Sequence, residues 1–288
     1  MGENTLIRLS AFADEAGKSL SAQIAALLRN DIRFTELRSV NGKNVSELTL
    51  SEAREIGATL GSNGIGLSAL GSPMGKVDIT VDFDKYLDAV KHMCELSNIL
   101  GTDKIRMFSF FNAYNERNRV IEYLSEMVEV AAGFGVYLCH ENEKKIYGDT
   151  VERVLDLAAN VKGLKFVYDP ANFLQVNEPS DKTLDAVHGI CEYFHIKDVI
   201  SATGELVPAG EGDGDIPRLV RMINKDTILT LEPHLKVFGG YDKIDGEKMQ
   251  HRHHFATNDE AFDAAVAALK GVLNQNGYTE KDGGFEKR

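Results

Sequence analysis

Acidic and imidazole side chains stand at or near the ends of four successive apolar runs in the second half of this sequence. They are Glu141, Asp169, His195 and Glu232, in the runs VYLCHE, KFVYD, YFHIKD and ILTLE. Carboxylates are rarely buried unless they are paired or bound to a metal. Three carboxylates gathered with one imidazole would repel one another, and a divalent cation relieves that repulsion. We therefore expect a metal site.

The chemistry of this set indicates which ions fit. Carboxylate oxygens and a single imidazole suit Mn²⁺, Mg²⁺, Co²⁺ or Fe²⁺ better than a structural zinc ion, which prefers thiolates. A single Asp or Glu at a strand end is more often a helix N-cap or a salt-bridge partner than a ligand. The metal hypothesis therefore depends on all four side chains meeting at one place.

Eight short runs rich in β-branched and aromatic residues are typical of strands. They cover residues 6–12, 34–38, 65–70, 104–110, 136–141, 165–169, 193–198 and 228–232. Amphipathic helical patterns separate these runs, and no two-residue hairpin turn joins any pair of them. The alternation predicts parallel βα units, and eight units in a chain of this length predict an α/β protein with a single (β/α)8 TIM barrel. An open doubly wound sheet is the alternative, which the lack of GxGxxG after the first run disfavours in its dinucleotide-binding form.

The barrel hypothesis places the four side chains on one rim. Catalytic groups of such barrels come from the C-terminal ends of the strands. The four residues follow one another at intervals of about 30 residues, the length of one βα unit. Side chains two apart on a strand share a face, so Val167 and Asp169 lie together, as do Thr230 and Glu232. We expect the four groups to converge.

Domain organisation and helix ends are also readable. Residues 1–278 contain no linker or low-complexity segment and are expected to form one barrel domain. Residues 279–288 are charged and contain glycine, which predicts a flexible C-terminal tail. Thr49 and Glu52 have the spacing of a capping box and predict the start of a helix.

Composition excludes several classes of partner. The chain has 288 residues, 43% of them hydrophobic, and a net charge of −12, which disfavours nucleic acid. Three scattered cysteines without a CxxC motif predict reduced thiols and a cytoplasmic location. There is no secretory signal pattern and no apolar run of the length that a membrane helix needs, so no membrane partner is expected.

Short motifs at these strand ends resemble a known family. They are HEN (140–142), DPANF (169–173), HIKD (195–198) and LEPH (231–234), together with ELR (36–38) and SPMGK (72–76). In order and spacing they are similar, over nearly the whole chain, to the xylose isomerase-like TIM-barrel superfamily of sugar isomerases and epimerases. That superfamily also includes inosose dehydratase and AP endonuclease relatives.

The resemblance implies roles for the four residues. Glu141, Asp169, His195 and Glu232 would bind one divalent ion, with Mn²⁺ favoured and Mg²⁺, Co²⁺, Fe²⁺ or Zn²⁺ as alternatives. Glu141 and Glu232 would also act as the acid/base pair. The endonuclease members need further histidines that the segments ALGSPMGK and RMFSFFN lack. Phosphodiester cleavage is therefore not expected.

Substrate contacts are expected from side chains around this rim. The candidates are Glu143, Asn172, Lys197, His234, Arg38 and Arg106. The epimerase pattern commonly has histidine where this chain has Glu143 and Asn172, so these contacts differ from that pattern. Lys76 is a further basic candidate, solvation being the alternative for all the basic residues.

Three other motifs receive structural interpretations. His140 adjoins Glu141 and should point toward the helix layer. The histidines of HRHHF (251–255) have no carboxylate frame, which favours a surface or interface role. GEGDGD (210–215) is expected to shape a loop over the site, because its own acidic charge opposes anion binding.

The expected function is a metal-dependent sugar or sugar-phosphate isomerase or epimerase. One glutamate would remove the proton α to a carbonyl and the other would return a proton to the opposite face of a metal-stabilised enediolate. The alternative is a lyase or dehydratase on a keto-sugar, inosose or keto-glycoside, with Glu143 and His234 as extra acids. A sugar-binding protein without turnover is disfavoured because both glutamates are present. The partner is a small-molecule carbohydrate, and a homo-oligomer is compatible with the sequence.

Overall fold

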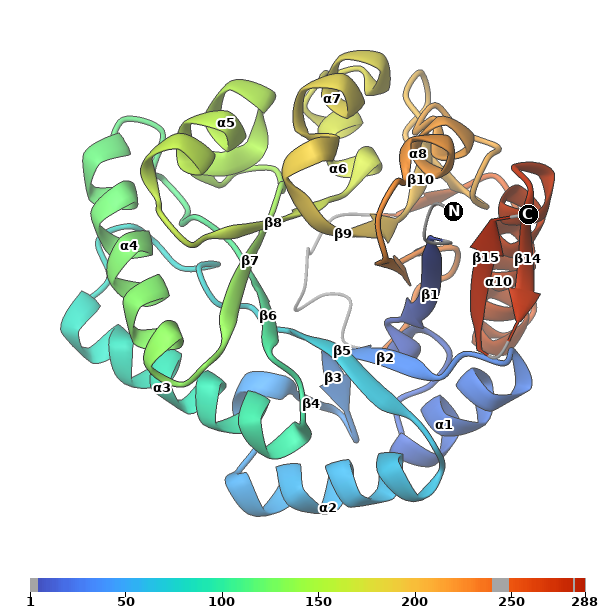
Figure 1. Ribbon diagram of the computed structural model, residues 1–288, viewed down its shortest axis with the longest axis horizontal. Coiled ribbons are helices and arrows are strands. Elements are labelled where there is room, and N and C mark those ends of the chain that lie inside the picture. The colour runs from blue at the N-terminus through green and yellow to red at the C-terminus, as the bar shows by residue number, and fades with distance from the viewer. Residues whose placement is uncertain (1–4, 240–248, 282, 288) are drawn as a thin grey trace.

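Eight parallel strands form the inner ring of the molecule (Figure 1). The computed structural model describes residues 5–239, 249–281 and 283–287. The ring consists of β1 (Leu6–Ala11), β2 (Phe34–Leu37), β5 (Gly66–Gly71), β6 (Lys104–Met107), β7 (Tyr137–Glu141), β8 (Lys165–Tyr168), β9 (Cys191–Ile196) and β12 (Thr227–Leu231). All eight predicted strands are therefore present.

The hydrogen-bonded order of the ring follows the chain. Starting at β2, the ladder runs through β5, β6, β7, β8, β9 and β12 to β1, and every pair is parallel. The first and last members of this ladder meet where the Thr35 hydroxyl donates to the carbonyl of Ala11 at 3.0 Å. The (β/α)8 barrel is confirmed, and the open doubly wound alternative is wrong.

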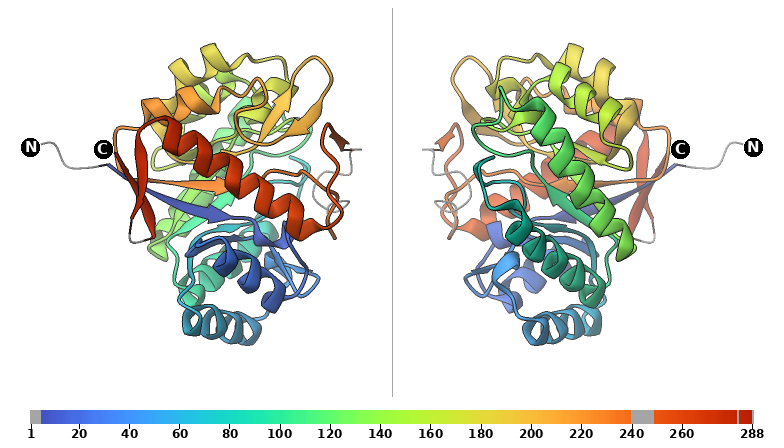
Figure 2. Two further views of the ribbon diagram at one scale, coloured as in Figure 1. Left: turned by 90° about the vertical axis from the view of Figure 1, so that its right-hand side faces the viewer. Right: turned by 90° about the vertical axis from the view of Figure 1, so that its left-hand side faces the viewer.

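Helices surround the ring, as Figures 1 and 2 show. They are α1 (Leu20–Arg29), α2 (Leu50–Ser62), α3 (Phe83–Leu100), α4 (Arg117–Gly133), α5 (Val151–Asn160), α6 (Pro170–Gln175), α7 (Ser180–Val187), α8 (Ile216–Met222) and α10 (Asn258–Gln275). The predicted capping box at Thr49 and Glu52 is present at the start of α2. None of the helices among the described residues is long and apolar enough to span a bilayer.

Two layers of apolar packing hold the barrel. The main core lies between strands and helices, for example at Leu138, Val154 and Leu157. A second, smaller cluster lies inside the ring, with side chains from β5, β7, β8 and β9: Ala69, Cys139, Val167 and Tyr193. The residues that follow these positions toward the strand ends form the candidate site.

The GEGDGD run forms a loop that closes on one carboxylate. Asp198, at the start of β10 (Asp198–Ile200), accepts the backbone N–H groups of Gly210, Gly212 and Gly214 at 2.8, 3.1 and 2.9 Å. A Cβ at Gly212 would come within 2.3 Å of the Asp198 Oδ1 atom, which explains the glycine there. Strand β10 pairs with β11 (Glu205–Val207), which pairs with β13 (Gln250–His251).

The C-terminal segment differs from its prediction. Composition predicts a flexible tail over residues 279–288, yet β14 (Tyr278–Lys281) and β15 (Gly284–Lys287) form an antiparallel hairpin. Strand β15 also pairs antiparallel with the start of β1. The physical reason is burial, because Tyr278 and Phe285 are each only 1% exposed. The DGG sequence between two short runs was the available hairpin signal.

One further short pair of strands lies near the rim. Strands β3 (Ser39–Val40) and β4 (Lys43–Asn44) form a two-stranded antiparallel hairpin directly after β2. The turn between them uses Asn41 and Gly42, both with positive φ. This hairpin carries Asn44 toward a cavity described below.

Candidate metal centre

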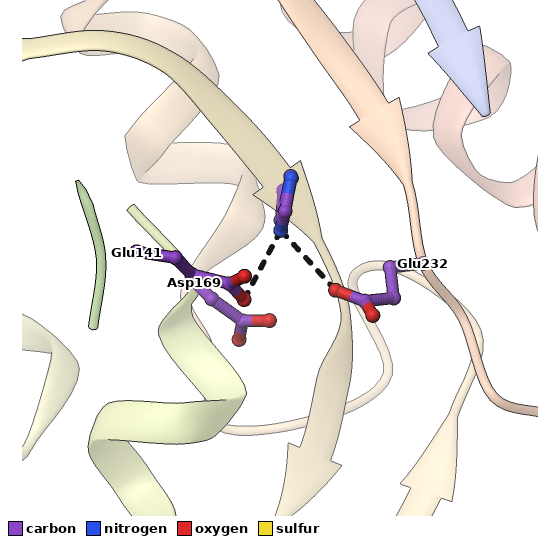
Figure 3. Close-up of side chains that lie close together, drawn as sticks. Glu141, Asp169 and Glu232 are labelled. Atoms are coloured by element: carbon purple, nitrogen blue, oxygen red, sulfur yellow. Dashed lines mark ion pairs between the residues drawn. The ribbon is translucent and has the colours of Figure 1, made fainter. Parts of the chain in front are cut away.

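Four side chains from neighbouring strand ends meet at one rim of the barrel. Glu141, Asp169, His195 and Glu232 each offer one ligand atom, and these atoms lie within 4.8 Å of one another. Figure 3 shows the three carboxylates pointing toward a common centre. The four side chains come from the ends of β7, β8, β9 and β12, which are consecutive in the ladder. The expected convergence is therefore present, and it is the one such group within the described ranges. We call Glu141, Asp169, His195 and Glu232 the metal group, after the ion that they could hold.

The unused hydrogen-bonding capacity of this group fits a metal ion. His195 Nδ1, Asp169 Oδ2 and Glu232 Oε2 are all buried and make no well-aligned hydrogen bond among the described residues, although each lies within ion-pair distance of a neighbour. His195 Nδ1 lies 3.1 Å from Glu141 Oε1 and 3.2 Å from Glu232 Oε2. Buried polar atoms are normally hydrogen-bonded. One nitrogen and three carboxylates are a donor set that a divalent cation would satisfy.

His195 is oriented from its other side by Glu36. The Nε2 atom lies 3.1 Å from Glu36 Oε2, and the Tyr193 hydroxyl donates to Glu36 Oε1 at 3.0 Å. A carboxylate on the remote ring nitrogen is the usual support of a metal-binding histidine. Glu36 is not among the ligands or contacts expected from the sequence, although a carboxylate inside the apolar run FTELR was the available signal.

Asp169 caps a helix and also belongs to the four-residue group. Its Oδ1 atom accepts the backbone N–H of Asn172 at 2.9 Å and caps α6, while Oδ2 faces the site. The backbone of Asp169 is fixed by two hydrogen bonds with the Asn142 side chain, at 2.8 and 2.9 Å. This explains the amide in the HEN motif.

Arginines hold the outer sides of the two glutamates. Arg38 Nη1 donates to Glu232 Oε1 at 2.8 Å, and the same guanidinium forms a bidentate pair with Asp14. Arg106 Nε lies 3.3 Å from Glu141 Oε2. Both arginines were predicted to bind substrate, and the structure places each in contact with an expected acid/base residue.

Two further predicted contacts lie against the metal group. Asn172 Nδ2 donates to Glu141 Oε1 at 3.1 Å. Lys197 Nζ lies 2.8 Å from Asp169 Oδ2 and 3.9 Å from Glu232 Oε2. The structure therefore brings both residues to the site that the sequence predicted for them.

Burial and neighbouring charge shift the pKa values of these groups. Burial raises the pKa of Asp169 to about 7, against the opposing effect of Lys197. Burial would also raise the pKa of Glu232, but Lys197 and His195 outweigh it and hold that pKa well below its usual range. Burial alone would lower the pKa of His195, yet Glu141 and Glu36 raise it well above the ordinary value. Glu232 is therefore ionised at neutral pH.

His234 lies beside Glu232 in a left-handed backbone conformation, with φ of 48°. The backbone N–H of His234 donates to Glu15 Oε2 at 2.8 Å. The ring atom Nε2 of His234 lies 3.5 Å from Glu232 Oε1. Burial lowers the pKa of His234 to about 4 and raises the pKa of Glu15 to about 8. Both groups are therefore mainly uncharged at neutral pH. Glu15 was not assigned from the sequence.

The remaining candidates contact partners outside the four ligand residues. Glu143 forms an ion pair with Lys76 at 3.1 Å. His140 Nε2 lies 2.9 Å from the Ser109 hydroxyl in the helix-facing layer, as predicted. In the HRHHF segment, His251 contacts the backbone carbonyl of His234 at 2.9 Å, and exposed His253 pairs with Glu211. The segment is therefore partly packed against the rim of the site.

Comparisons with known proteins agree with this geometry. The model of the xylose isomerase-like TIM barrel family matches residues 24–270. A 3-dehydroshikimate dehydratase of Bacillus anthracis is 23% identical over 222 residues, covering 69% of this chain and 72% of the relative.

Two solved structures of similar fold bear on the site. A D-psicose 3-epimerase, crystallised in the presence of D-fructose, has a TM-score of 0.70 at 16% identity, covering 93% of this chain and 98% of its own. The IOLI protein with a bound zinc atom has a TM-score of 0.71 at 15% identity, covering 93% and 99%. These relatives share the fold and include enzymes of more than one reaction type.

Proposed function

The chain belongs to the xylose isomerase-like TIM barrel family, and we propose that it is a divalent-metal-dependent isomerase or epimerase of a small sugar or sugar phosphate. The observation that carries the proposal is the convergence of four buried ligand atoms, from Glu141, Asp169, His195 and Glu232, within 4.8 Å of one another. We propose Mn²⁺ as the ion. We also propose a cytoplasmic location for the protein, which the three free, buried cysteines support.

A divalent cation at this site would supply Lewis-acid polarisation of a substrate carbonyl and so make the adjacent C–H bond more acidic. The chain supplies the proton transfers. Glu141 and Glu232 stand on opposite sides of the group, on β7 and β12, and each has its outer oxygen held by an arginine. One carboxylate removes a proton from one face of the substrate, and the other returns a proton to the opposite face.

A dehydratase is the second candidate. The similarity to a 3-dehydroshikimate dehydratase favours it. Elimination needs a further proton donor for the leaving hydroxyl, for which the sequence offers Glu143 and His234. Burial lowers the pKa of His234, and burial would raise the pKa of Glu143 but Lys76 outweighs it and lowers that pKa, so both are mainly unprotonated at neutral pH and the dehydratase ranks second. Both candidates share the metal group and differ in the fate of the enediolate.

Metal analysis and isotope exchange test the proposal together. The purified protein should contain, or take up, about one divalent ion per chain. In D2O, the Mn²⁺-loaded protein should introduce deuterium at the carbon α to the carbonyl of an accepted ketose, which NMR detects. A dehydratase would instead form a conjugated enone with new ultraviolet absorbance.

Substitution of the two glutamates separates catalysis from binding. Glu232→Gln and Glu141→Gln should each lower the exchange rate at least about 100-fold, since general acid–base catalysis contributes that much. Glu126→Gln is the control because Glu126 is exposed on α4. Retention of full exchange by both site variants, or uptake of no metal by the wild-type protein, would contradict the proposal.

A further inference from the structure

A cavity of about 180 Å³ adjoins the metal group on the β2, β5 and β6 side of the rim. Three of the side chains that line it are cationic, namely Arg38, Lys76 and Arg106, and no acidic residue of the described chain lines it. Arg38 and Arg106 also contact Glu232 and Glu141, so this cavity lies next to the reacting centre.

Arg106 has hydrogen-bonding capacity that the described residues do not use. Its side chain is buried, with the residue 4% exposed. Nη1 donates to the backbone carbonyl of Ser72 at 3.2 Å, whereas buried Nε faces Glu36 and Glu141 without a hydrogen bond in the described chain. Because Nε is directed at these two carboxylates, an anionic ligand in the cavity would be bound by the terminal nitrogens of the guanidinium.

Arg38 and Lys76 contribute to the cavity in different ways. Every guanidinium nitrogen of Arg38 already donates to Asp14, Glu15 or Glu232, so Arg38 contributes charge rather than a new hydrogen bond. Lys76 Nζ lies 4.4 Å from the centre of the Phe108 ring, and the Arg106 guanidinium carbon lies 4.6 Å from the same centre. One aromatic ring therefore contacts both cations, and Lys76 is also held by its ion pair with Glu143 at 3.1 Å.

The backbone of this cavity favours a carboxylate over a phosphate. Phosphate sites commonly use several backbone N–H groups or a helix N-terminus. In the loop after β5, the N–H of Met74 donates to the Ser72 hydroxyl, that of Gly75 to the Tyr86 hydroxyl, and that of Lys76 to the carbonyl of Pro73. Side chains are thus the available donors, and a guanidinium matches the two oxygens of a carboxylate.

We propose that the substrate is a keto-sugar acid whose carboxylate binds in this cavity against Arg106 and Lys76, while its carbonyl faces the four-ligand group. The inference rests on the proposed function and names the substrate class for it. Arg106 is then a specificity-determining residue, because it would bind the carboxylate and also contact Glu141.

Matched substrates test the inference. D-fructose and D-tagatose would each be compared with the corresponding uronate, which carries a carboxylate at C6, and with the 6-phosphate. Calorimetric titration of the Mn²⁺-loaded protein should give a Kd for the uronates at least tenfold lower than for the neutral ketoses and for the phosphates. Equal affinity for neutral ketoses and uronates overturns the inference, and so does preference for the phosphates.

Variants assign the preference to the cavity rather than to the metal. Arg106→Gln should raise the Kd of a uronate about 10- to 100-fold and change the Kd of the neutral ketose much less. Lys76→Gln should raise the uronate Kd by a smaller factor. If the Arg106 variant does not fold, the effect of Lys76→Gln on the uronate Kd by itself tests the inference. Arg119→Gln and Lys85→Gln remove exposed charges on α4 and α3 and should change neither value. Equal effects of Arg106→Gln on both ligands overturn the inference.

Failure of the inference can be told apart from failure of the proposed function. After removal of metal with a chelator, the uronate should still bind more tightly to the wild-type protein than to Lys76→Gln. If Mn²⁺ binds and neutral ketoses exchange deuterium while uronates show no advantage, the function stands and the inference is wrong. If the protein takes up no metal, the proposed function is wrong, and the chelated-protein comparison still judges the carboxylate subsite.

Discussion

At the scale of single residues, the site depends on side chains whose two ends face different neighbours. Asp169 caps a helix with one oxygen and points its other oxygen toward the other three residues of the metal group. His195 presents Nδ1 to the same group while Glu36 contacts Nε2. Because these contacts fix orientation before any ion binds, the group is arranged for coordination at little conformational cost.

Glu36 should matter for metal affinity even though it is not one of the four ligands. Glu36→Gln should weaken divalent-metal binding about 10- to 100-fold, because the carboxylate fixes the ring and tautomer of His195. Titration of the metal-free protein with Mn²⁺ measures this directly. Tyr193→Phe removes one of the two hydrogen bonds to Glu36 and should have a much smaller effect. Equal affinities of Glu36→Gln and wild type would contradict this role.

At the scale of elements, the loops after the strands are as closely packed as the barrel itself. Asp198 ties down the glycine-rich loop, and Asn142 ties β7 to the end of β8. Gly148 lies where the loop after β7 passes His140, and a Cβ there would come 2.3 Å from His140 Cε1. The backbone at this point therefore approaches the imidazole closely.

Two glycine substitutions should have opposite effects on stability. Gly148→Ala should lower the free energy of unfolding by about 1–3 kcal/mol, because the buried His140 ring must move. Gly61→Ala, in α2 with nothing within 4 Å of the new Cβ, should raise it by about 0.4–1 kcal/mol. Urea denaturation measures both. An unchanged free energy of unfolding for Gly148→Ala would contradict close packing of the loop against His140.

At the scale of the whole molecule, the first and last helices of the barrel meet. Arg29 of α1 contacts Asp263 of α10 at 3.0 Å, and the Asn30 side chain donates to the same carboxylate at 2.6 Å. Burial would raise the pKa of Asp263, but these two partners outweigh it and lower the pKa below its usual value. This contact joins segments from opposite ends of the sequence.

The contribution of Asp263 to stability should depend on pH. Because its pKa is lowered on folding, the stabilisation is present above the ordinary carboxyl pKa of about 4 and is lost as the pH falls through the lowered value. Asp263→Asn should lower the free energy of unfolding by about 0.5 kcal/mol at pH 7, a small figure since the side chain is 40% exposed. Denaturation at pH 7 and at pH 3.5 should show the difference shrinking. Asp88→Asn, at a more exposed ion pair, is the control.

The C-terminal hairpin offers a test of where the folded domain ends. Phe285→Ala should lower the free energy of unfolding by about 3 kcal/mol, because the side chain is 1% exposed within the core. Glu286→Ala, next to it and partly exposed, should cost far less. Thermal or urea denaturation compares the two. Identical stability of both variants would restore the prediction of a flexible tail.

The sequence by itself determined the eight strands, their parallel alternation with helices and the four ligand-type residues. It could do so because strand periodicity and the strand-end position of catalytic groups are properties of local sequence and of spacing. The capping box at Thr49 and the outward-facing His140 were predictable for the same reason.

Only the tertiary structure decided which side chains support those four. Glu15, Glu36 and Asn142 contact residues far away in the sequence, and the local pattern around each of them does not identify those partners. The cationic cavity beside the metal group and the pairing of β15 with β1 are also products of long-range closure. Distances between remote segments depend on packing of the whole barrel, which local patterns do not encode.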